Sequence, residues 1–220
     1  MRITLGIVIC FLLFGSSLAQ DESSEWIEKG KSAYDSAQYE TALTHFLKAS
    51  EISPEQVEPH FRMGITYIEL EKFKDARDSF LRALEIDSTN RDCWNDLGFS
   101  YNRLGKYEEA IPCFEKTIEL TPDIPNPYAH MGYSYIRLGN FRQAKYQLDQ
   151  SSKQSEDYDK YYFYVACYYG ALNQITDAID IMEVAVEKGF KDVNWIKKEK
   201  SLRSIQKEMR FKKLVKSLEE

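Results

Sequence analysis

The sequence predicts an all-α solenoid of about five helix pairs, because one 34-residue pattern recurs five times and each copy contains two helical runs. Alanine returns every 34 residues, and a large apolar residue follows it by four positions. Several columns in phase are typical of repeat proteins, in which stacked copies bury a continuous core. The alanine column is Ala42, Ala76, Ala110, Ala144 and Ala178, and the apolar column is Phe46, Phe80, Phe114, Leu148 and Met182.

Each copy is predicted to form two helices joined by a short turn. In the third copy, residues 94–101 follow helical spacing, Gly105 interrupts the pattern, and residues 107–118 restart it before Pro122. Two sequence pairs, Asn126-Pro127 and Glu58-Pro59, predict helix starts with proline at the first helical position.

Small residues recur where the two helices of a copy are expected to cross. Glycine occupies one column in four copies and alanine in the fifth: Gly30, Gly64, Gly98, Gly132 and Ala166. Antiparallel helices approach to about 8–10 Å only where the crossing point lacks bulk. We therefore expect Gly98 and Ala110 to form such a contact, and leucine at either position to destabilise the array.

The third copy contains Trp-x2-Leu-Gly-x2-Tyr, Gly-x-Tyr, Ala-x3-Phe and a final proline, with Thr117 where a small alanine is usual. On these residues the chain resembles the tetratricopeptide repeat (TPR) family over about residues 23–190. The copies span about 23–56, 57–90, 91–124, 125–158 and 159–190. The resemblance implies a right-handed superhelix with the first helix of each pair on its inside. The terminal copies depart from the pattern at Lys29, Ala33, Ala166, Asn173 and Ile175.

Residues 191–220 are predicted to form a helical cap over the apolar end of the fifth copy. They resemble the short closure that often follows bacterial TPR arrays, with Met209 in place of its usual proline. The residues that carry this resemblance are Trp195, Ile196, Leu202, Ile205, Arg210, Phe211 and Leu214.

Residues 1–19 have the layout of a secretory signal peptide: a basic start, an apolar run from Ile3 to Phe14, and small residues up to Ala19. The alternative is an uncleaved membrane anchor, but the run is shorter than the roughly 20 residues that a spanning helix needs. We therefore expect cleavage near Ala19 and a periplasmic or secreted chain beginning at Gln20.

The charge argues against nucleic-acid binding. Removing residues 1–19 takes away only Arg2, which leaves 28 basic and 35 acidic residues and a net charge of −7. Within this chain, residues 191–220 hold ten basic and five acidic residues, a net +5, so the remainder carries −12. Contact of this basic segment with an anionic membrane surface is the less favoured alternative to a cap with a solvated basic face.

No motif for phosphate binding, zinc binding or nucleophilic catalysis is present in the sequence, so we expect no enzyme, no metal site and no cofactor. Three widely spaced cysteines (Cys93, Cys113 and Cys167) are expected to be buried apolar side chains. His60 occupies an aromatic column and is expected in the core, whereas His130 is expected to face the groove.

The concave side of the array is predicted to bind a protein or peptide segment. Aromatic and arginine side chains concentrate beside the packing columns of the first helices, and this composition is typical of binding hot spots. The predicted groove consists of Phe61, Arg62, Ile65, Asn95, Phe99, Asn102, Arg103, Tyr133, Arg137, Phe163 and Tyr164. The alternative is that the cap or a neighbouring chain covers these aromatic residues.

The middle of this groove, from Phe99 to Arg137, is predicted to grip the partner most firmly. Exchanging Arg103 and Arg137 for glutamate is accordingly predicted to weaken capture with little change in melting temperature. Two functions remain open: a monomeric adaptor that binds a partner, and a self-associating structural scaffold of an envelope assembly.

Overall fold

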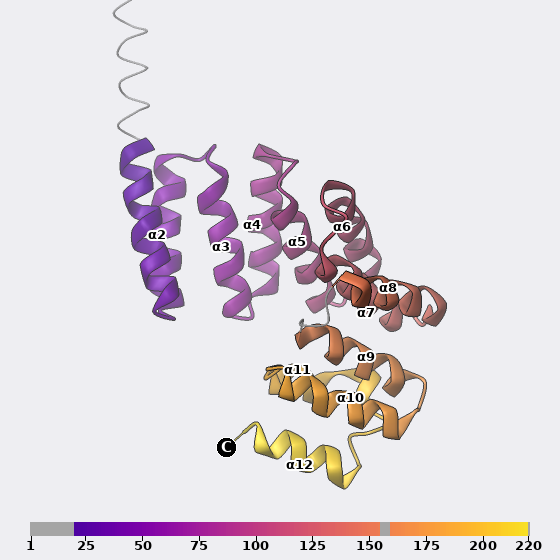
Figure 1. The fold of residues 1–220 in the computed structure, drawn as a ribbon. Helices are drawn as coiled ribbons and strands as arrows, with labels where there is room; N and C mark the ends of the chain where they lie inside the picture. The colour runs from indigo at the N-terminus through magenta and orange to yellow at the C-terminus, as the bar shows by residue number, and fades with distance from the viewer. Residues whose placement is uncertain (1–19, 155–158, 220) are drawn as a thin grey trace, which may run out of the picture. The chain divides into compact units, whose positions relative to one another are not determined.

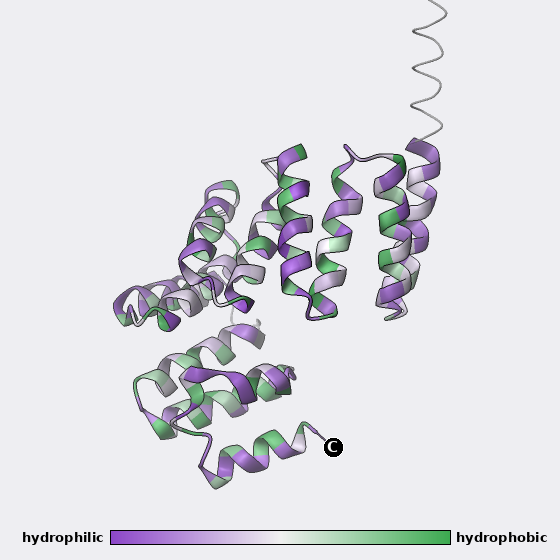
Figure 2. Ribbon diagram, turned by 180° about the vertical axis from the view of Figure 1, so that it is seen from behind, coloured by the Kyte–Doolittle hydropathy of each residue, from purple (hydrophilic) through white to green (hydrophobic). Residues whose placement is uncertain are grey.

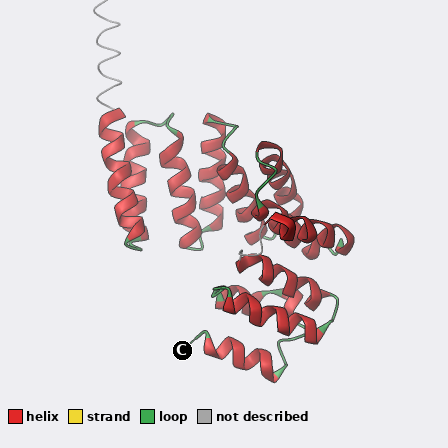
Figure 3. Ribbon diagram, in the orientation of Figure 1, coloured by secondary structure: helices red, strands yellow, loops and turns green. Residues whose placement is uncertain are grey.

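The computed structural model describes residues 20–154 and 159–219. These residues form helices and connecting loops without a strand (Figure 3). Residues 20–35 are helical and precede α2 (Tyr39–Ile52). Four further pairs follow along the chain (Figure 1): α3 (Val57–Glu69) with α4 (Phe73–Ile86), α5 (Arg91–Arg103) with α6 (Tyr107–Leu120), α7 (Pro125–Arg137) with α8 (Phe141–Gln154), and α9 (Asp159–Ala171) with α10 (Ile175–Glu187). The chain ends with α11 (Val193–Lys198), the 3₁₀ turn η1 (Lys200–Leu202) and α12 (Met209–Ser217).

The second helices of the five pairs begin 34 residues apart, at Tyr39, Phe73, Tyr107, Phe141 and Ile175. This spacing confirms the all-α repeat architecture that the sequence period predicts. Hydrophobic and hydrophilic residues alternate within the helices (Figure 2), as expected when every helix buries one side.

The close helix crossings follow from the small residues. All five alanines of the repeating column have no exposed surface. A Cβ atom added to Gly64 would lie 2.4 Å from Cε1 of Phe80, and one added to Gly30 would lie 2.4 Å from Cε1 of Phe46. Glycine is therefore required at both positions for the large side chain of the second helix to pack against the first.

Two helix starts differ from the prediction. Helix α3 begins at Val57, one residue before Glu58, and α7 begins at Pro125, two residues before Pro127. The N–H groups of the first helical turn have no acceptor within the helix, so proline is tolerated beyond the first position. Pro59 and Pro127 therefore lie in the first turn of their helices but not at its first residue, which in α7 is another proline, Pro125.

The chain divides into two compact units, an N-terminal unit up to Ser100 and a C-terminal unit from Tyr101, so that α5 contains the boundary. In the N-terminal unit, Ile27, Ala42 and Phe46 belong to one buried cluster. In the C-terminal unit, Phe114 and Met131 belong to another.

The three described cysteines, Cys93, Cys113 and Cys167, are free and buried, as predicted. No helix in the part of the chain that the structure describes is long and apolar enough to cross a membrane. The predicted signal peptide, residues 1–19, lies outside the described residues.

Candidate protein-binding surfaces

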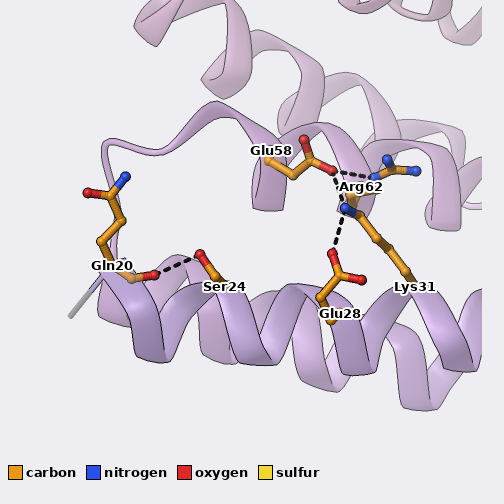
Figure 4. Close-up of polar contacts among 6 residues, drawn as sticks. All are labelled: Gln20, Ser24, Glu28, Lys31, Glu58 and Arg62. Atoms are coloured by element: carbon orange, nitrogen blue, oxygen red, sulfur yellow. Dashed lines mark hydrogen bonds and ion pairs between the residues drawn. The ribbon is translucent and has the colours of Figure 1, made fainter. Parts of the chain in front are cut away.

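In the N-terminal unit, the first helices are joined by a network of charged side chains (Figure 4). Lys31, on the helix of residues 20–35, reaches Glu28 at 3.0 Å on its own helix and Glu58 of α3 at 3.2 Å. Arg62 donates to the same Glu58 oxygen from Nε at 2.8 Å. Burial raises the pKa of Glu58, but hydrogen bonds from Arg62 and Lys31 outweigh burial and hold it below its usual range. These side chains are partly exposed and offer both signs of charge to a partner.

The apolar residues predicted for this part of the groove are partly buried. Phe61 and Ile65 of α3 keep some exposed surface, and the Phe61 ring lies 6.0 Å from that of Phe80. On α5, Asn95 has a buried Oδ1 with no hydrogen-bond partner among the residues of the described ranges. Phe99, predicted as an exposed groove residue, is only 6% exposed, so that prediction is wrong for this side chain. Of the predicted groove, Phe61, Arg62, Ile65 and Asn95 thus remain partly accessible.

In the C-terminal unit, an aromatic cluster fills the place predicted for the groove. The Trp195 ring of α11 lies 4.9 Å from Phe163, 5.6 Å from Tyr133 and 5.9 Å from Tyr164. Phe190 stacks on Phe163 with ring centroids 4.3 Å apart. Phe163 and Tyr164 have no exposed surface, and Tyr133 is 2% exposed. The segment after α10 therefore covers these aromatic residues.

A buried carboxylate fixes the same segment to α7. The side chain of Glu199 is 1% exposed and lies 3.1 Å from Nη1 of Arg137. Tyr133 donates its hydroxyl to this carboxylate at 2.6 Å, and the Ser201 backbone N–H donates to its other oxygen at 2.8 Å. Burial and the charge of Glu199 raise the pKa of Tyr133 well above its usual value, so the phenol stays a donor. Arg137 is thus committed to an internal ion pair.

The other predicted polar groove residues are engaged as well. Arg103 pairs with Asp192 at 3.1 Å and lies over the Trp195 ring, 4.4 Å from its centre. Asn102 donates to the backbone oxygen of His130 at 3.1 Å and accepts from Ser134 at 2.7 Å, which ties α5 to α7.

The predicted open groove is therefore corrected for Asn102, Arg103, Tyr133, Arg137, Phe163 and Tyr164. In the C-terminal unit, residues of the predicted cap cover the aromatic side chains of the predicted groove, which was the alternative to an open groove. Helix α11 and η1 do not merely close the end of the fifth copy, because Trp195 and Glu199 reach Tyr133 and Arg137 of α7. Glutamate at Arg103 and Arg137 would place acids beside Asp192 and Glu199, so we now expect it to lower the melting temperature.

His130 is also buried rather than facing the groove. It is 3% exposed, stacks on Phe114 with ring centres 5.4 Å apart, and makes a 2.8 Å hydrogen bond with the Tyr164 hydroxyl. Burial, followed by the charge of Lys160, lowers its pKa well below the usual value. The ring is therefore a neutral core residue.

Sequence reasoning missed a hydrogen bond that repeats along the array. His60, expected in the core, is only partly buried, and its Nε2 pairs with the Pro54 carbonyl at 3.0 Å. Trp94 donates to the Ser88 carbonyl at 2.9 Å. Tyr128 donates to the Pro122 carbonyl at 3.1 Å. In each case the accepting carbonyl lies six residues before the ring, in the loop that precedes the first helix of the copy. The ring therefore anchors that loop to the helix. The sequence held one signal for this bond: His60, Trp94 and Tyr128 occupy the same repeat position, and each ring can carry a polar hydrogen.

Within the described ranges, no group of three or more His, Cys, Asp or Glu residues is placed to hold a metal ion. Repeated helix pairs and close small-residue crossings define an α-helical repeat protein. Two models described as "Tetratricopeptide repeat" match residues 57–90 and 92–124. Both stretches are therefore tetratricopeptide repeats, and proteins built from such repeats are generally protein-interaction scaffolds.

Solved structures support the same fold. A MamA protein is 18% identical with a TM-score of 0.64, covering 82% of this chain and 96% of that chain. TTC0263, a thermophilic TPR protein from Thermus thermophilus, is 19% identical with a TM-score of 0.65, covering 82% of this chain and 98% of that chain. YrrB, described as a TPR protein with an unusual peptide-binding site, is 20% identical with a TM-score of 0.58, covering 74% of this chain and 84% of that chain. At such identities the likeness shows the fold alone. No curated protein matches the chain.

Proposed function

We propose that this chain is an exported, non-catalytic adaptor that binds a segment of another protein through the first helices of its N-terminal unit. The observation that carries the proposal is the contrast between the two units. In the C-terminal unit the predicted groove residues are covered by the chain's own residues 190–205, whereas Phe61, Arg62 and Ile65 stay partly exposed.

The proposed site combines apolar surface with directional polar groups. Phe61 and Ile65 provide apolar area, and the charges of Lys31, Glu58 and Arg62 are held in place by one another. YrrB is described as having a peptide-binding site, which is consistent with a peptide-like ligand on this fold.

Site-specific photo-crosslinking in the native host tests this surface. A photoreactive residue at Ile65 should give one defined adduct, whereas the same residue at Leu47, which is 42% exposed on α2, should not. Arg62→Glu should reduce the Ile65 adduct, and Lys72→Glu, an equal charge change on an exposed residue, should leave it intact. Equal adducts from both crosslinking positions would exclude the proposed surface.

Export and assembly state are separate parts of the proposal. The apolar run that ends in small residues at Ala19 supports cleavage before Gln20 and a location in the cell envelope or outside the cell. N-terminal sequencing from the natural host should find Gln20, and a mature protein that retains Met1 would contradict export by this route. Light scattering over a range of concentrations should show a monomer. A concentration-dependent oligomer would favour the self-associating scaffold instead.

A further inference from the structure

We propose a second binding site, independent of the first, at α12: a basic pocket that binds an acidic protein segment containing an apolar side chain. The pocket has a volume of about 300 Å³. Its lining consists of Lys197, Gln206, Phe211, Lys212, Val215, Lys216 and Glu219. Among the described residues of this lining, three side chains are positive and one is negative, and Phe211 and Val215, which are 3% and 9% exposed, form its apolar floor.

The basic face of α12 is turned outward. Met209, Lys212, Lys213 and Lys216 are exposed and follow the three-and-four spacing that places residues on one side of a helix. Phe211 and Val215, on the opposite side, are buried. Lys212 and Lys216 border the pocket, so the basic face and the pocket are continuous.

The chain itself shows which chemical group this pocket accepts. The carboxylate of Glu219 lies 2.5 Å from Nζ of Lys197, and both side chains are about half exposed, at 47% and 51%. Such an exposed pair contributes little stability, so a carboxylate from a partner can take the place of Glu219. Residues 191–220 carry a net +5, which also favours an acidic ligand.

The walls of the pocket are held in place. The buried side chains of Phe211 and Val215 hold α12 against the rest of the unit, and Arg210 also pairs with Asp180 and Glu183 of α10. Gln206 donates to the backbone oxygen of Lys197 at 3.1 Å and fixes the loop opposite. A preformed pocket loses less entropy on binding than one that must be assembled.

A membrane surface fits this site less well than a protein segment. Helices that lie on a bilayer insert an apolar face into it. In α12 that face is already packed against the protein through Phe211 and Val215, which leaves Met209, at 67% exposure, as the large apolar side chain on the outer face. The geometry therefore favours an acidic segment with one apolar side chain beside its carboxylates.

Fluorescence anisotropy with a fluorescein-labelled peptide of repeated Glu-Glu-Leu triplets tests the site on the chain beginning at Gln20. Lys212→Glu with Lys216→Glu should weaken binding by about tenfold or more, because two charge-assisted contacts become repulsive. Lys72→Glu with Lys74→Glu makes an equal charge change on exposed residues of the N-terminal unit and should have no effect. The unchanged melting temperature of both variants would show that each remains folded.

Glu219→Gln gives a test in the opposite direction. It removes the internal competitor and should tighten binding by about two- to fivefold, the range that a surface ion pair supports. Glu187→Gln, the same charge change on an exposed residue of α10, should not. Unchanged affinity in Glu219→Gln would overturn the proposal, as would equal weakening by the Lys72 and Lys74 control or equal binding of a Gln-Gln-Leu peptide.

Two further measurements distinguish other occupants. Co-sedimentation with phosphatidylglycerol vesicles that exceeds peptide binding and is lost in the Lys212 and Lys216 variant would assign the face to a membrane. Self-association that the same variant abolishes would assign it to a second copy of the chain. Either result would replace the proposed acidic partner. Failure of the Ile65 crosslink would leave this test unaffected, because the two sites share no residue.

Discussion

The ion pair between Arg137 and Glu199 is expected to hold residues 190–205 against α7 within the C-terminal unit. Removing one member of a buried pair costs about 3–5 kcal/mol, because the other charge is left without compensation. Arg137→Met leaves the Glu199 side chain, 1% exposed, with only Tyr133 and the Ser201 N–H as donors. We expect a loss near the upper end of that range.

Glu199→Gln should cost less, about 3 kcal/mol, the lower end of the same range. Arg137 is 14% exposed and lies 4.8 Å from the centre of the Tyr107 ring, so part of its charge remains stabilised. The double variant should lose less than the sum of the two single losses, with a coupling energy of about 2 kcal/mol, because neither charge is then left alone.

Urea unfolding followed through Trp195 measures these losses. Trp26→Phe and Trp94→Phe, both in the N-terminal unit, leave Trp195 as the single tryptophan, so its fluorescence reports the C-terminal unit. Lys116→Met with Glu119→Gln is the control, because this exposed pair on α6 should contribute less than about 1 kcal/mol. Additive losses at Arg137 and Glu199 would refute the assigned role of the pair.

Three further outcomes follow from the packing. Gly64→Ala should destabilise the N-terminal unit by about 1–3 kcal/mol, because the added methyl group overpacks against Phe80. The control Lys74→Ala should change the stability little. Equal urea midpoints for the two variants would contradict the close crossing of α3 and α4. Because burial depresses the pKa of His130 below its unfolded value of about 6.5, stability present above that pH should be lost as pH falls, by up to about 1.4 kcal/mol per unit. His130→Gln should flatten this dependence between pH 7 and 5, and an unchanged slope would assign it to other groups. The three cysteines should resist a thiol reagent until the chain unfolds. Burial raises the pKa of Cys93 and Cys113 to about 12 and that of Cys167 well above its usual value, so little reactive thiolate is present. Rapid reaction of the folded chain would contradict their burial.

The repeat columns are the part of this molecule that could be derived from the residues alone. Ala42 and Gly30 pack against neighbours within one helix pair, and the same steric demand returns 34 residues later, so a local rule becomes visible as a period. Helix starts were less accurate, because Pro59 and Pro127 are tolerated anywhere in the first turn. The ring hydrogen bonds of His60, Trp94 and Tyr128 also escaped, although they repeat, because their acceptors are backbone oxygens that carry no sequence identity.

What covers the first helices was decided only by tertiary structure. Tyr133 and Arg137 occupy positions that the repeat pattern leaves free, and their residue types suit a ligand-binding groove as well as an internal contact. Their actual partners, Trp195 and Glu199, lie about 60 residues later in a segment outside the repeat, so no period relates the two sets. The sequence by itself determined the stacking of the helix pairs, because each pair must satisfy the same crossing. Only the folded chain decided which part of the predicted groove stays open, because a carboxylate and an indole from a non-repeating segment are buried there and exclude a partner.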